Sequence, residues 1–411
     1  MGARVYLQTF GCKVNQVDSI AIAHDLLARE IGLVSTLEDA DTVVINTCSV
    51  TARSDAKVRK AIRRALGTAH IRLVVATGCS AVVNGQKLAA LGERVLVEPD
   101  KTNVAVRIAN ADVGEVVSGS LLPDNLLRTR VNLKISDGCE NFCSYCIVPY
   151  SRGSIHPTPA TSLIAQAQEL VNQGTKEIIL TGINIGTYQD GDLDLVSLIC
   201  RLRDEAGVYR IRVSSIEPPT ITQEFVDLFN ETGIVCQHLH IPLQSGSDKV
   251  LRDMGRHYTA DRYRRLIETL RVACPNIAIH TDVIVGYPTE TDDDFKQTFD
   301  LACQLEFAGM HLFKYSPRPH TPAASLRPLA PPLIEERFTS LQEVALKSAQ
   351  AYRARRLLLA EPLELLIERI TDKEVVATSR EHITISWDIA KSPFAKAQVG
   401  DIVEYREGDG I

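Results

Sequence analysis

Three cysteines in the middle of the chain have types and a spacing that could do chemistry. Cys139, Cys143 and Cys146, the central cysteines, form a CxxxCxxC array just after a strand-like segment. Three thiolates on one tight loop can hold three irons of a 4Fe-4S cube and leave the fourth iron open to a small chelating substrate. A zinc site is the alternative, but such sites typically use CxxC pairs and need a fourth ligand. The array therefore predicts an iron-sulfur cluster.

A second set of cysteines lies nearer the N-terminus, and each member follows an apolar run. These N-terminal cysteines are Cys12 after the run Arg4 to Thr9, Cys48 after Thr42 to Thr47, and Cys79 after Leu73 to Thr77. Because parallel strands share a direction, we expect the three thiols along the carboxyl edge of one sheet, where open α/β sheets bind ligands. Buried core cysteines are the alternative. Three equivalent loop positions favour a shared metal or cluster site.

Composition sets wide bounds on the rest of the molecule. The chain has 411 residues, a formal net charge of -6 and ten cysteines. This length indicates two or three domains, and the mild acidity restricts any nucleic-acid contact to local patches. Because no apolar run is long enough for a membrane span, we expect a cytoplasmic protein with reduced thiols. The remaining cysteines have no ligand spacing and are expected in the core: Cys200, Cys236, Cys274 and Cys303.

The first segment, residues 1–120, alternates strand-like and helical patterns. Helical periodicity over Ser19 to Arg29 and over Asp55 to Leu66 separates the apolar runs. This order predicts an open parallel α/β sheet with βαβ connections. Residues 121–130, which include Pro123 and Asn125, are typical of a linker.

The second segment, residues 131–345, repeats a strand-helix unit. Strands are expected at 131–136, 177–180, 210–214, 236–242, 277–285 and 310–315, and helices at 161–173, 193–205, 221–230, 260–273 and 292–305. These units predict a partial (β/α)6 barrel with its chemistry at the carboxyl ends of the strands. A charged helix, 333–359, leads into residues 346–411, whose short β-like runs predict a small antiparallel β-barrel. The predicted fold class is α/β.

Several motifs match one known family over nearly the whole chain. They are Thr9-Phe10-Gly11-Cys12-Lys13-Val14-Asn15-Gln16, Asn46-Thr47-Cys48, Gly78-Cys79, the central array with Ile147-Val148-Pro149-Tyr150-Ser151-Arg152-Gly153, His240-Ile241-Pro242-Leu243-Gln244-Ser245-Gly246-Ser247 and Asp282-Val283-Ile284-Val285-Gly286-Tyr287-Pro288. With these motifs the sequence resembles the radical S-adenosyl-L-methionine (AdoMet) methylthiotransferases, which build a methylthio group onto an unactivated C-H bond.

Within that family the sequence is most similar to one branch. Gly11-Cys12-Lys13 with Asn15, Asn46-Thr47-Cys48 with Val50-Thr51, and Ser136-Asp137-Gly138-Cys139 resemble the branch that acts on threonylcarbamoyladenosine beside the tRNA anticodon. The isopentenyladenosine branch tends to carry Gly-Cys-Gln-Met-Asn near its start instead. The resemblance therefore implies methylthiolation at C2 of the adenine of threonylcarbamoyladenosine.

The resemblance also implies cofactors and partners. Two 4Fe-4S clusters and AdoMet are expected. The central cysteines would hold the cluster that binds AdoMet and cleaves it reductively to a 5'-deoxyadenosyl radical, and the N-terminal cysteines would hold an auxiliary cluster that carries or supplies sulfur. One AdoMet would methylate that sulfur, and a second would give the radical that removes hydrogen from C2. The implied partners are tRNA and an electron donor such as flavodoxin or ferredoxin, with no membrane, and we expect a monomer.

Further candidates lie where barrel ligands come from, just after the expected strands. They are Gly182 and Asn184 after the second strand, Ser214 and Glu217 after the third, and His240 and Gln244 after the fourth. AdoMet or substrate contact and structural hydrogen bonding are equal alternatives for these residues. Tyr145, between two central cysteines, resembles the aromatic position whose backbone contacts the adenine of AdoMet, with ordinary packing as the alternative.

Four basic residues recur at helical spacing just after the Cys48 loop. They are Arg53, Lys57, Lys60 and Arg64, the basic stripe, opposite Val58, Ile62 and Ala65. A solvated helix face is the default interpretation, and binding of tRNA phosphates is the alternative that the neighbouring cysteine loop suggests. The C-terminal barrel resembles a TRAM module, a small RNA-binding barrel.

The sequence and its resemblance together predict a three-domain enzyme that methylthiolates threonylcarbamoyladenosine in tRNA. The same chemistry on isopentenyladenosine in tRNA or on a ribosomal-protein side chain is the closest alternative. An iron-sulfur electron carrier or RNA-binding protein without turnover is the alternative from another class. An electron carrier normally has all four irons ligated by protein, so the open iron expected on the central cysteines argues against it.

Overall fold

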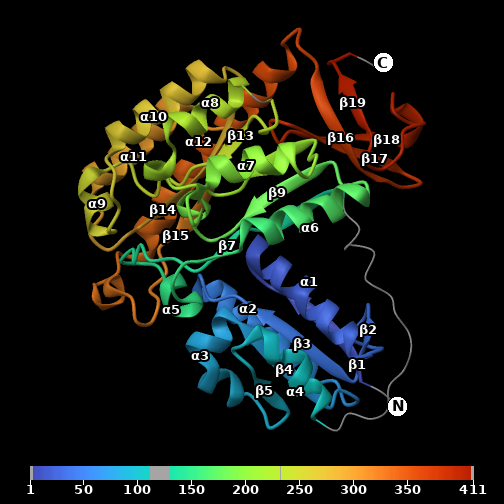
Figure 1. Ribbon diagram of the computed structural model, residues 1–411. Coiled ribbons are helices and arrows are strands. Elements are labelled where there is room, and N and C mark those ends of the chain that lie inside the picture. The colour runs from blue at the N-terminus through green and yellow to red at the C-terminus, as the bar shows by residue number, and fades with distance from the viewer. Residues whose placement is uncertain (1–2, 112–128, 232, 409–411) are drawn as a thin grey trace. The chain divides into compact units, whose positions relative to one another are not determined.

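The computed structural model describes residues 3–111, 129–231 and 233–408. These residues divide into two compact units, shown with their element labels in Figure 1. The first unit comprises 3–111, 137–155 and 316–325, and the second comprises 129–136, 156–315 and 326–408. The linker expected at 121–130 lies outside the described residues except for 129 and 130. The three-domain division stays a prediction, and within the described ranges no helix is long and apolar enough to cross a bilayer.

The first unit is built on a parallel sheet in the strand order β2-β1-β3-β4-β5. Its strands are β1 (Arg4–Thr9), β2 (Gly32–Val34), β3 (Thr42–Thr47), β4 (Leu73–Gly78) and β5 (Val95–Val97). The three strands expected from apolar runs are present and lie side by side at the centre of the sheet. The edge strands β2 and β5 escape the sequence pattern because three residues are too few to show a period.

Helices cover both faces of this sheet (Figure 1). They are α1 (Lys13–Ala28), α2 (Ala52–Leu66), α3 (Cys79–Ala89) and α4 (Val104–Ala109), and α5 (Val148–Arg152) belongs to the same unit. α1 and α4 pack with Val44 and Val75 on one face, whereas α2 and α3 pack with Val43 and Val74 on the other. Neighbouring residues of β3 and β4 thus enter opposite cores, which explains why both strands are continuous apolar runs.

The second unit contains two three-stranded parallel sheets, ordered β12-β9-β6 and β13-β14-β15. The strands are β6 (Arg130–Lys134), β9 (Glu177–Thr181), β12 (Arg210–Val213), β13 (His238–His240), β14 (Ala278–Val285) and β15 (Gly309–Lys314). Parallel bridges from Ile211 to Val235 and from Ser215 to His240 connect the two sheets. The resulting order, β6-β9-β12-β13-β14-β15, is that of the partial (β/α)6 barrel expected from the sequence.

The barrel helices lie between successive strands. They are α6 (Ala160–Asn172), α7 (Leu195–Asp204), α8 (Gln223–Glu231), α9 (Asp248–Asp253), α10 (Ala260–Ala273) and α11 (Asp292–Leu305), and the short strands are β7 (Ser136–Asp137), β8 (His156–Pro157), β10 (Gln189–Asp190) and β11 (Leu193–Asp194). α10 and α11 have the bounds expected from the sequence. A capping box between Thr291 and Asp294 makes the start of α11 readable from the sequence.

The C-terminal strands form an antiparallel sheet in the order β18-β17-β16-β19. They are β16 (Leu363–Ile370), β17 (Glu374–Ser379), β18 (Thr384–Asp388) and β19 (Ile402–Tyr405), preceded by α12 (Pro331–Leu357). Phe338 and Leu341 of α12 pack with the barrel core, whereas Tyr352 and Leu357 pack with the core of the C-terminal sheet. The helix therefore changes core near the domain boundary expected between residues 345 and 346.

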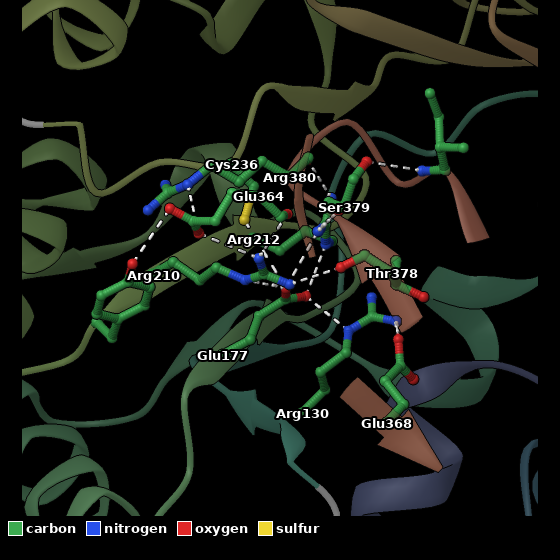
Figure 2. Close-up of polar contacts among 12 residues, drawn as sticks. Arg130, Glu177, Arg210, Arg212, Cys236, Glu364, Glu368, Thr378, Ser379 and Arg380 are labelled. Atoms are coloured by element: carbon green, nitrogen blue, oxygen red, sulfur yellow. Dashed lines mark hydrogen bonds and ion pairs between the residues drawn. The ribbon is translucent and has the colours of Figure 1, made fainter. Parts of the chain in front are cut away.

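A buried ion network joins the C-terminal sheet to the amino-terminal ends of the barrel strands (Figure 2). Glu177, the first residue of β9, is fully buried and pairs with Arg210 and Arg212 of β12 at 2.7 Å each. Arg210 also donates to the carbonyl of Thr378 at 3.1 Å, and Arg212 donates to the carbonyl of Ser379 at 3.0 Å. Each guanidinium group therefore connects the barrel with β17.

The arginines around Glu177 hold its carboxyl in the charged form. Arg130 of β6 adds a third contact, at 2.8 Å. Burial alone would raise the pKa of Glu177, but Arg212, Arg130 and Arg210 more than offset burial and lower that pKa far below its ordinary value. Because the folded pKa lies below the unfolded one, the stabilisation is present above the unfolded pKa and is lost as the pH falls toward the folded pKa.

We expect Glu177→Gln to destabilise the second unit, since the change leaves two fully buried guanidinium groups without their carboxylate. Removing one partner of a buried ion pair costs about 3–5 kcal/mol, which urea unfolding followed by circular dichroism would measure. Glu205→Gln is the matched control, because Glu205 pairs with Arg201 on an exposed helix face and such pairs contribute little. Equal unfolding midpoints for wild type and Glu177→Gln would contradict a stabilising role of the network.

Candidate iron-sulfur site

The N-terminal cysteines lie on loops at the carboxyl edge of the first sheet. Cys12 directly precedes α1, Cys48 directly follows β3, and Cys79 is the first residue of α3. Cys48 and Cys79 are buried, and Cys12 is exposed. Two of the three thiols thus lie at helix N-termini, where the helix dipole favours negative charge.

Gly11 allows the Cys12 and Cys48 loops to meet. Its φ of 105° lies in the region that favours glycine, and a Cβ atom there would lie 2.9 Å from Cys48 Cβ and 3.1 Å from Cys48 Sγ. No side chain fits at this contact. Burial raises the pKa of the Cys48 thiol, and the neighbouring Cys79 raises it further. A bound cation is therefore what would hold Cys48 as a thiolate ligand.

Polar side chains from the motifs hold these loops together. Asn15 of α1 donates to the carbonyl of Thr47 at 2.9 Å, and Asn46 donates to the carbonyl of Asn15 at 2.8 Å. Thr47 Oγ1 accepts the main-chain N–H groups of Ser80 and Ala81 at 3.0 and 3.1 Å. Thr47 thus satisfies two donors in the first turn of α3 that a helix leaves free. The motif residues next to the cysteines are scaffolding that fixes the three loops.

The loop of the central cysteines is shaped by close main-chain contacts. Cys139 N–H donates to the carbonyl of Gly153 at 3.1 Å. Gly138 has a φ of 80°, and a Cβ atom there would overlap the carbonyl oxygen of Ser154. Phe142 has a φ of 44° although its side chain is large. Such strained positions cluster at ligand-binding sites.

Arg152, the last residue of α5, links this loop to α1. Its guanidinium donates to both carboxylate oxygens of Asp137 at 2.7 and 2.8 Å, lies 3.4 Å from Asp18, and donates to Asn15 Oδ1. The Arg152 side chain is only 2% exposed. Lys101 pairs with Asp18 at 2.5 Å and adds a second cation to the cluster.

The charges around Arg152 keep its guanidinium ionised. Burial alone would lower its pKa, but Cys79 and Asp137, the largest opposing charges, raise it above the ordinary value. This coupling shows that Arg152 lies within electrostatic reach of the N-terminal cysteines. A buried and permanent positive charge there stabilises thiolates, so the donor set suits an anionic cluster.

Asp55 and Arg318 form a second buried pair beside the N-terminal cysteines. Arg318 Nη1 donates to Asp55 at 2.6 Å and to the carbonyl of Ser49 at 3.0 Å. Asp55 also accepts a hydrogen bond from Ser80 Oγ at 3.0 Å. Because Ser49 and Ser80 each directly follow an N-terminal cysteine, this pair fixes the positions of both loops.

In the second unit, three buried oxygens near the carboxyl ends of β6 and β9 have no hydrogen-bond partner among the described residues. They are Ser136 Oγ, Thr181 Oγ1 and Asn184 Oδ1. Gly182 lies against them, since a Cβ atom there would be 2.7 Å from Ser136 Oγ. Leaving such groups unsatisfied costs about 1–3 kcal/mol each. This edge, with the expected contact residues Gly182 and Asn184, therefore suits a polar ligand that donates hydrogen bonds.

Ser214 and Glu217, also expected to contact a ligand, have surroundings different from those of the unsatisfied oxygens. Ser214 is buried just after β12, and Glu217 forms an ion pair with Arg256. The Arg256 guanidinium also lies 5.1 Å from the centre of the Tyr258 ring. Glu217 therefore has a structural partner within the second unit. Tyr145 lies half-buried on the central loop of the first unit.

His240 and Gln244 flank Asp282 of β14. His240 Nε2 lies 3.0 Å from Asp282 Oδ1, and Gln244 N–H donates to the carbonyl of Asp282 at 2.8 Å. Burial alone would raise the pKa of Asp282, but hydrogen bonds from His240 and His311 lower it to about 2. Gln244 is buried with a φ of 63°, another strained backbone position at the barrel edge.

The basic stripe borders a cavity of the first unit. The cavity has a volume of about 450 Å³, and its lining includes Lys57, Lys60, Arg64, Tyr6 and Phe10. Arg53 is exposed near the start of the same helix. Val58, Ile62 and Ala65 form the buried face of α2, as the periodicity predicts. The stripe thus combines positive charge with two aromatic rings.

Two family models match parts of this chain. Residues 133–302 match the Radical SAM superfamily, and residues 4–97 match the uncharacterized protein family UPF0004. The central cysteines lie in the first matched region and the N-terminal cysteines in the second. The protein is therefore a radical SAM enzyme, a class that uses AdoMet and a 4Fe-4S cluster.

Relatives with similar sequences show to which family of radical SAM enzymes the chain belongs. The chain is 37% identical to threonylcarbamoyladenosine tRNA methylthiotransferase MtaB of Bacillus subtilis over 79% of this chain and 76% of the relative. It is 33% identical to MtaB of Thermotoga maritima over 98% of this chain and 94% of the relative. It is also 34% identical to the tRNA-2-methylthio-N(6)-dimethylallyladenosine synthase of Thermodesulfovibrio yellowstonii over 79% of each. The chain belongs to the radical AdoMet methylthiotransferase family, which confirms the resemblance seen in the motifs.

Solved structures support the fold alone. The radical S-adenosylmethionine methyltransferase TsrM from Kitasatospora setae has a TM-score of 0.57 at 16% identity, covering 79% of this chain and 77% of that chain. The cobalamin-dependent radical enzyme OxsB has a TM-score of 0.52 at 11% identity, covering 84% and 56%. The fold class expected from the sequence is confirmed.

Sequence reasoning missed the charged groups that hold the cysteine loops, chiefly Asp18, Asp55 and Arg318. Arg152 and Asn15 lie inside the quoted motifs, so a motif-based reading could have singled them out. Arg318 lies far along the chain from the N-terminal cysteines. No local pattern shows that it pairs with Asp55.

We expect Arg152→Gln to lower both the stability of the first unit and its iron content after reconstitution, because Asp18 and Asp137 lose a shared cation that is more buried than Lys101, which also pairs with both of them. Breaking this buried cluster should cost about 3–5 kcal/mol, measured by thermal unfolding beside an iron assay. Arg29→Gln is the control, since Arg29 pairs with Asp25 on the exposed face of α1. Wild-type iron content and stability in Arg152→Gln would show that the thiols do not need this charge.

Proposed function

We propose that the protein adds a methylthio group to C2 of the adenine of threonylcarbamoyladenosine, beside the anticodon of tRNA. The identity to Thermotoga maritima MtaB carries this proposal, because it extends over 98% of the chain and spans both cysteine sets. The Bacillus subtilis relative with the same name is 37% identical. The dimethylallyladenosine synthases, one of them 34% identical, make that nucleoside the second candidate substrate.

Two 4Fe-4S clusters are part of the proposal, one on the central cysteines and one on the N-terminal cysteines. Each set offers three soft sulfur donors in the first unit, and the buried positive charge of Arg152 lies within electrostatic reach of Cys79 and Cys12. When bound, the first cluster supplies the electron that cleaves AdoMet, and the second supplies an iron at which sulfur can bind. An electron donor such as flavodoxin or ferredoxin would supply reducing equivalents.

The barrel residues expected to contact AdoMet keep that role in the proposal. They are Gly182, Asn184, Ser214, Glu217, His240 and Gln244, with the backbone of Tyr145. The unsatisfied oxygens of Ser136, Thr181 and Asn184 can accept hydrogen bonds from amino or hydroxyl groups of AdoMet. Gly182 leaves the space beside Ser136 free of a side chain.

The substrate assignment predicts which modified adenosine in tRNA receives the methylthio group. Reduced protein supplied with AdoMet and a sulfur source should convert threonylcarbamoyladenosine in tRNA to its methylthio form and should leave isopentenyladenosine unchanged. Mass spectrometry of nucleosides from the two digested tRNAs measures both outcomes. If only isopentenyladenosine yields product, that nucleoside is the substrate in place of threonylcarbamoyladenosine. Absence of both products and of 5'-deoxyadenosine would favour an iron-sulfur protein without turnover.

Mutations in the two cysteine sets should affect different steps of the reaction. Cys143→Ala is expected to abolish both 5'-deoxyadenosine formation and methylthiolation, since AdoMet cleavage needs the cluster on the central cysteines. Cys48→Ala is expected to continue forming 5'-deoxyadenosine without methylthiolated nucleoside. Soluble expression and iron retained at the intact site are the controls, because ligand loss can unfold a domain. Methylthiolation by well-folded Cys48→Ala protein would show that the N-terminal cysteines are structural.

For the basic stripe we propose contact with tRNA phosphates. Lys57, Lys60 and Arg64 are gathered around one cavity, and its two aromatic rings offer surfaces on which an unstacked base could lie. Arg64 keeps only a weak exposed pairing with Glu38, at 3.7 Å. The cations are therefore available to a phosphate backbone.

The double change Lys57→Gln with Lys60→Gln is expected to weaken tRNA binding and to reduce the salt dependence of the binding constant by about one power of salt concentration per lost phosphate contact. Filter binding at several salt concentrations measures this slope. The double change Arg59→Gln with Arg63→Gln removes the same charge from the same helix outside the stripe and is the control. Identical slopes for both double variants would leave the stripe as a solvated helix face.

A further inference from the structure

Three histidines of the second unit lie close together. His238 is the first residue of β13, His280 lies on β14, and His382 lies in the turn between β17 and β18. Each offers one ring nitrogen, and these three nitrogens all lie within 4.8 Å of one another. The histidines come from segments far apart in the sequence, so no spacing motif predicts the cluster.

His238 is the unusual member of this cluster. Its side chain is buried, and neither ring nitrogen has a hydrogen-bond partner in the part of the chain that the structure describes. A buried polar group without a partner costs about 1–3 kcal/mol, and native structures rarely leave both nitrogens of one ring in that state. Burial and the neighbouring His280 lower the pKa of His238 well below its ordinary value. Neutral imidazole with a free lone pair is the form in which histidine binds metals.

The surroundings hold the other two rings in place. A Cβ atom on Gly309 would lie 2.9 to 3.0 Å from atoms of the His280 ring, so only glycine leaves room for that ring. His382 has a φ of 66°, in the left-handed region, and its N–H donates to the carbonyl of Ser379 at 3.0 Å. The turn therefore holds a strained backbone at the residue that faces the two barrel histidines.

The spacing of the rings fits one tetrahedral ion. The ring centres lie 4.6 Å apart for His238 and His280, 4.6 Å for His238 and His382, and 5.6 Å for His280 and His382. A zinc ion bound at 2.0–2.1 Å by three imidazoles has ring centres about 3.2 Å from the metal and therefore about 5.2 Å from one another. Small ring rotations would bring the three nitrogens to a common centre.

A neighbouring cluster provides a contrast. His240, Asp282 and His311 also gather their ligand atoms within 4.8 Å. There the carboxylate of Asp282 lies 3.0 Å from His240 Nε2 and 3.3 Å from His311 Nδ1. Those three groups satisfy one another without an ion. The first cluster has three ring nitrogens and no carboxylate among its members, and both ring nitrogens of His238 lack a hydrogen-bond partner among the described residues.

We propose that His238, His280 and His382 bind one zinc ion that joins barrel strands β13 and β14 to the β17–β18 turn. Three neutral imidazoles are a common zinc donor set, and water can fill the fourth position. The site lies at the same end of the barrel strands as the Glu177 network, which also contacts β17. The ion would thus add a second anchor between the barrel and the C-terminal sheet, independent of the proposed methylthiolation.

The test uses the full chain with its iron-sulfur clusters reconstituted, so that the cysteine thiolates are already occupied by iron. Zinc is added anaerobically, excess is removed, and zinc per chain is measured by elemental analysis. His382→Asn is the main variant, because asparagine tolerates the left-handed backbone of residue 382 but removes the imidazole. His257→Asn removes an exposed histidine of the same unit and is the matched control.

Wild type and His257→Asn are expected to retain one zinc ion per chain, and His382→Asn is expected to bind zinc about a hundredfold more weakly. Zinc should also raise the thermal unfolding midpoint of wild type but not of His382→Asn. Equal zinc retention in His382→Asn, or equal loss in His257→Asn, would overturn the proposal. If His382→Asn does not fold, X-ray absorption at the zinc edge of wild type decides. A nitrogen shell near 2.0 Å supports the site, and sulfur near 2.3 Å refutes it.

Discussion

The first unit depends on the ion pairs that the buried guanidinium group of Arg152 forms with Asp137 and Asp18. Burial, with the neighbouring Cys79, raises the pKa of the Cys48 thiol at the edge of the sheet. Asp18, Asp137 and Asn15 hold the positive charge of Arg152, which lies within electrostatic reach of Cys79 and Cys12. The same side chain joins the central loop to α1. Charge compensation and loop position are therefore provided by one residue.

The two ends of the barrel strands differ in how their polar groups are satisfied. At the amino end, Glu177 is surrounded by arginines that also bond the main chain of β17, so burial leaves its charge fully paired. At the carboxyl end, Ser136, Thr181 and Asn184 have buried oxygens without hydrogen-bond partners within residues 3–111, 129–231 and 233–408. The paired charges around Glu177 stabilise the fold, and the buried oxygens at the carboxyl end can receive a ligand, as is usual at that end of such barrels.

Much of the architecture follows from local pattern. β1 and β3 have the bounds expected from their apolar runs, and so do α10 and α11, because strand length, helical period and capping residues are all written within a few residues. The motifs also led to the family. The edge strands β2 and β5 were not expected, since they depend on pairing with a neighbour and not on a pattern of their own.

The sequence by itself determined the two cysteine sets, the order of strands and helices, and the family, because these depend on residue type and short spacing. Only the tertiary structure decided which distant groups meet. Arg318 reaches Asp55, Arg152 reaches Asp18, and His382 reaches His238 across long stretches of chain. Such partners depend on how strands and loops pack in three dimensions, and burial then makes each pairing energetically decisive because water cannot replace a missing partner.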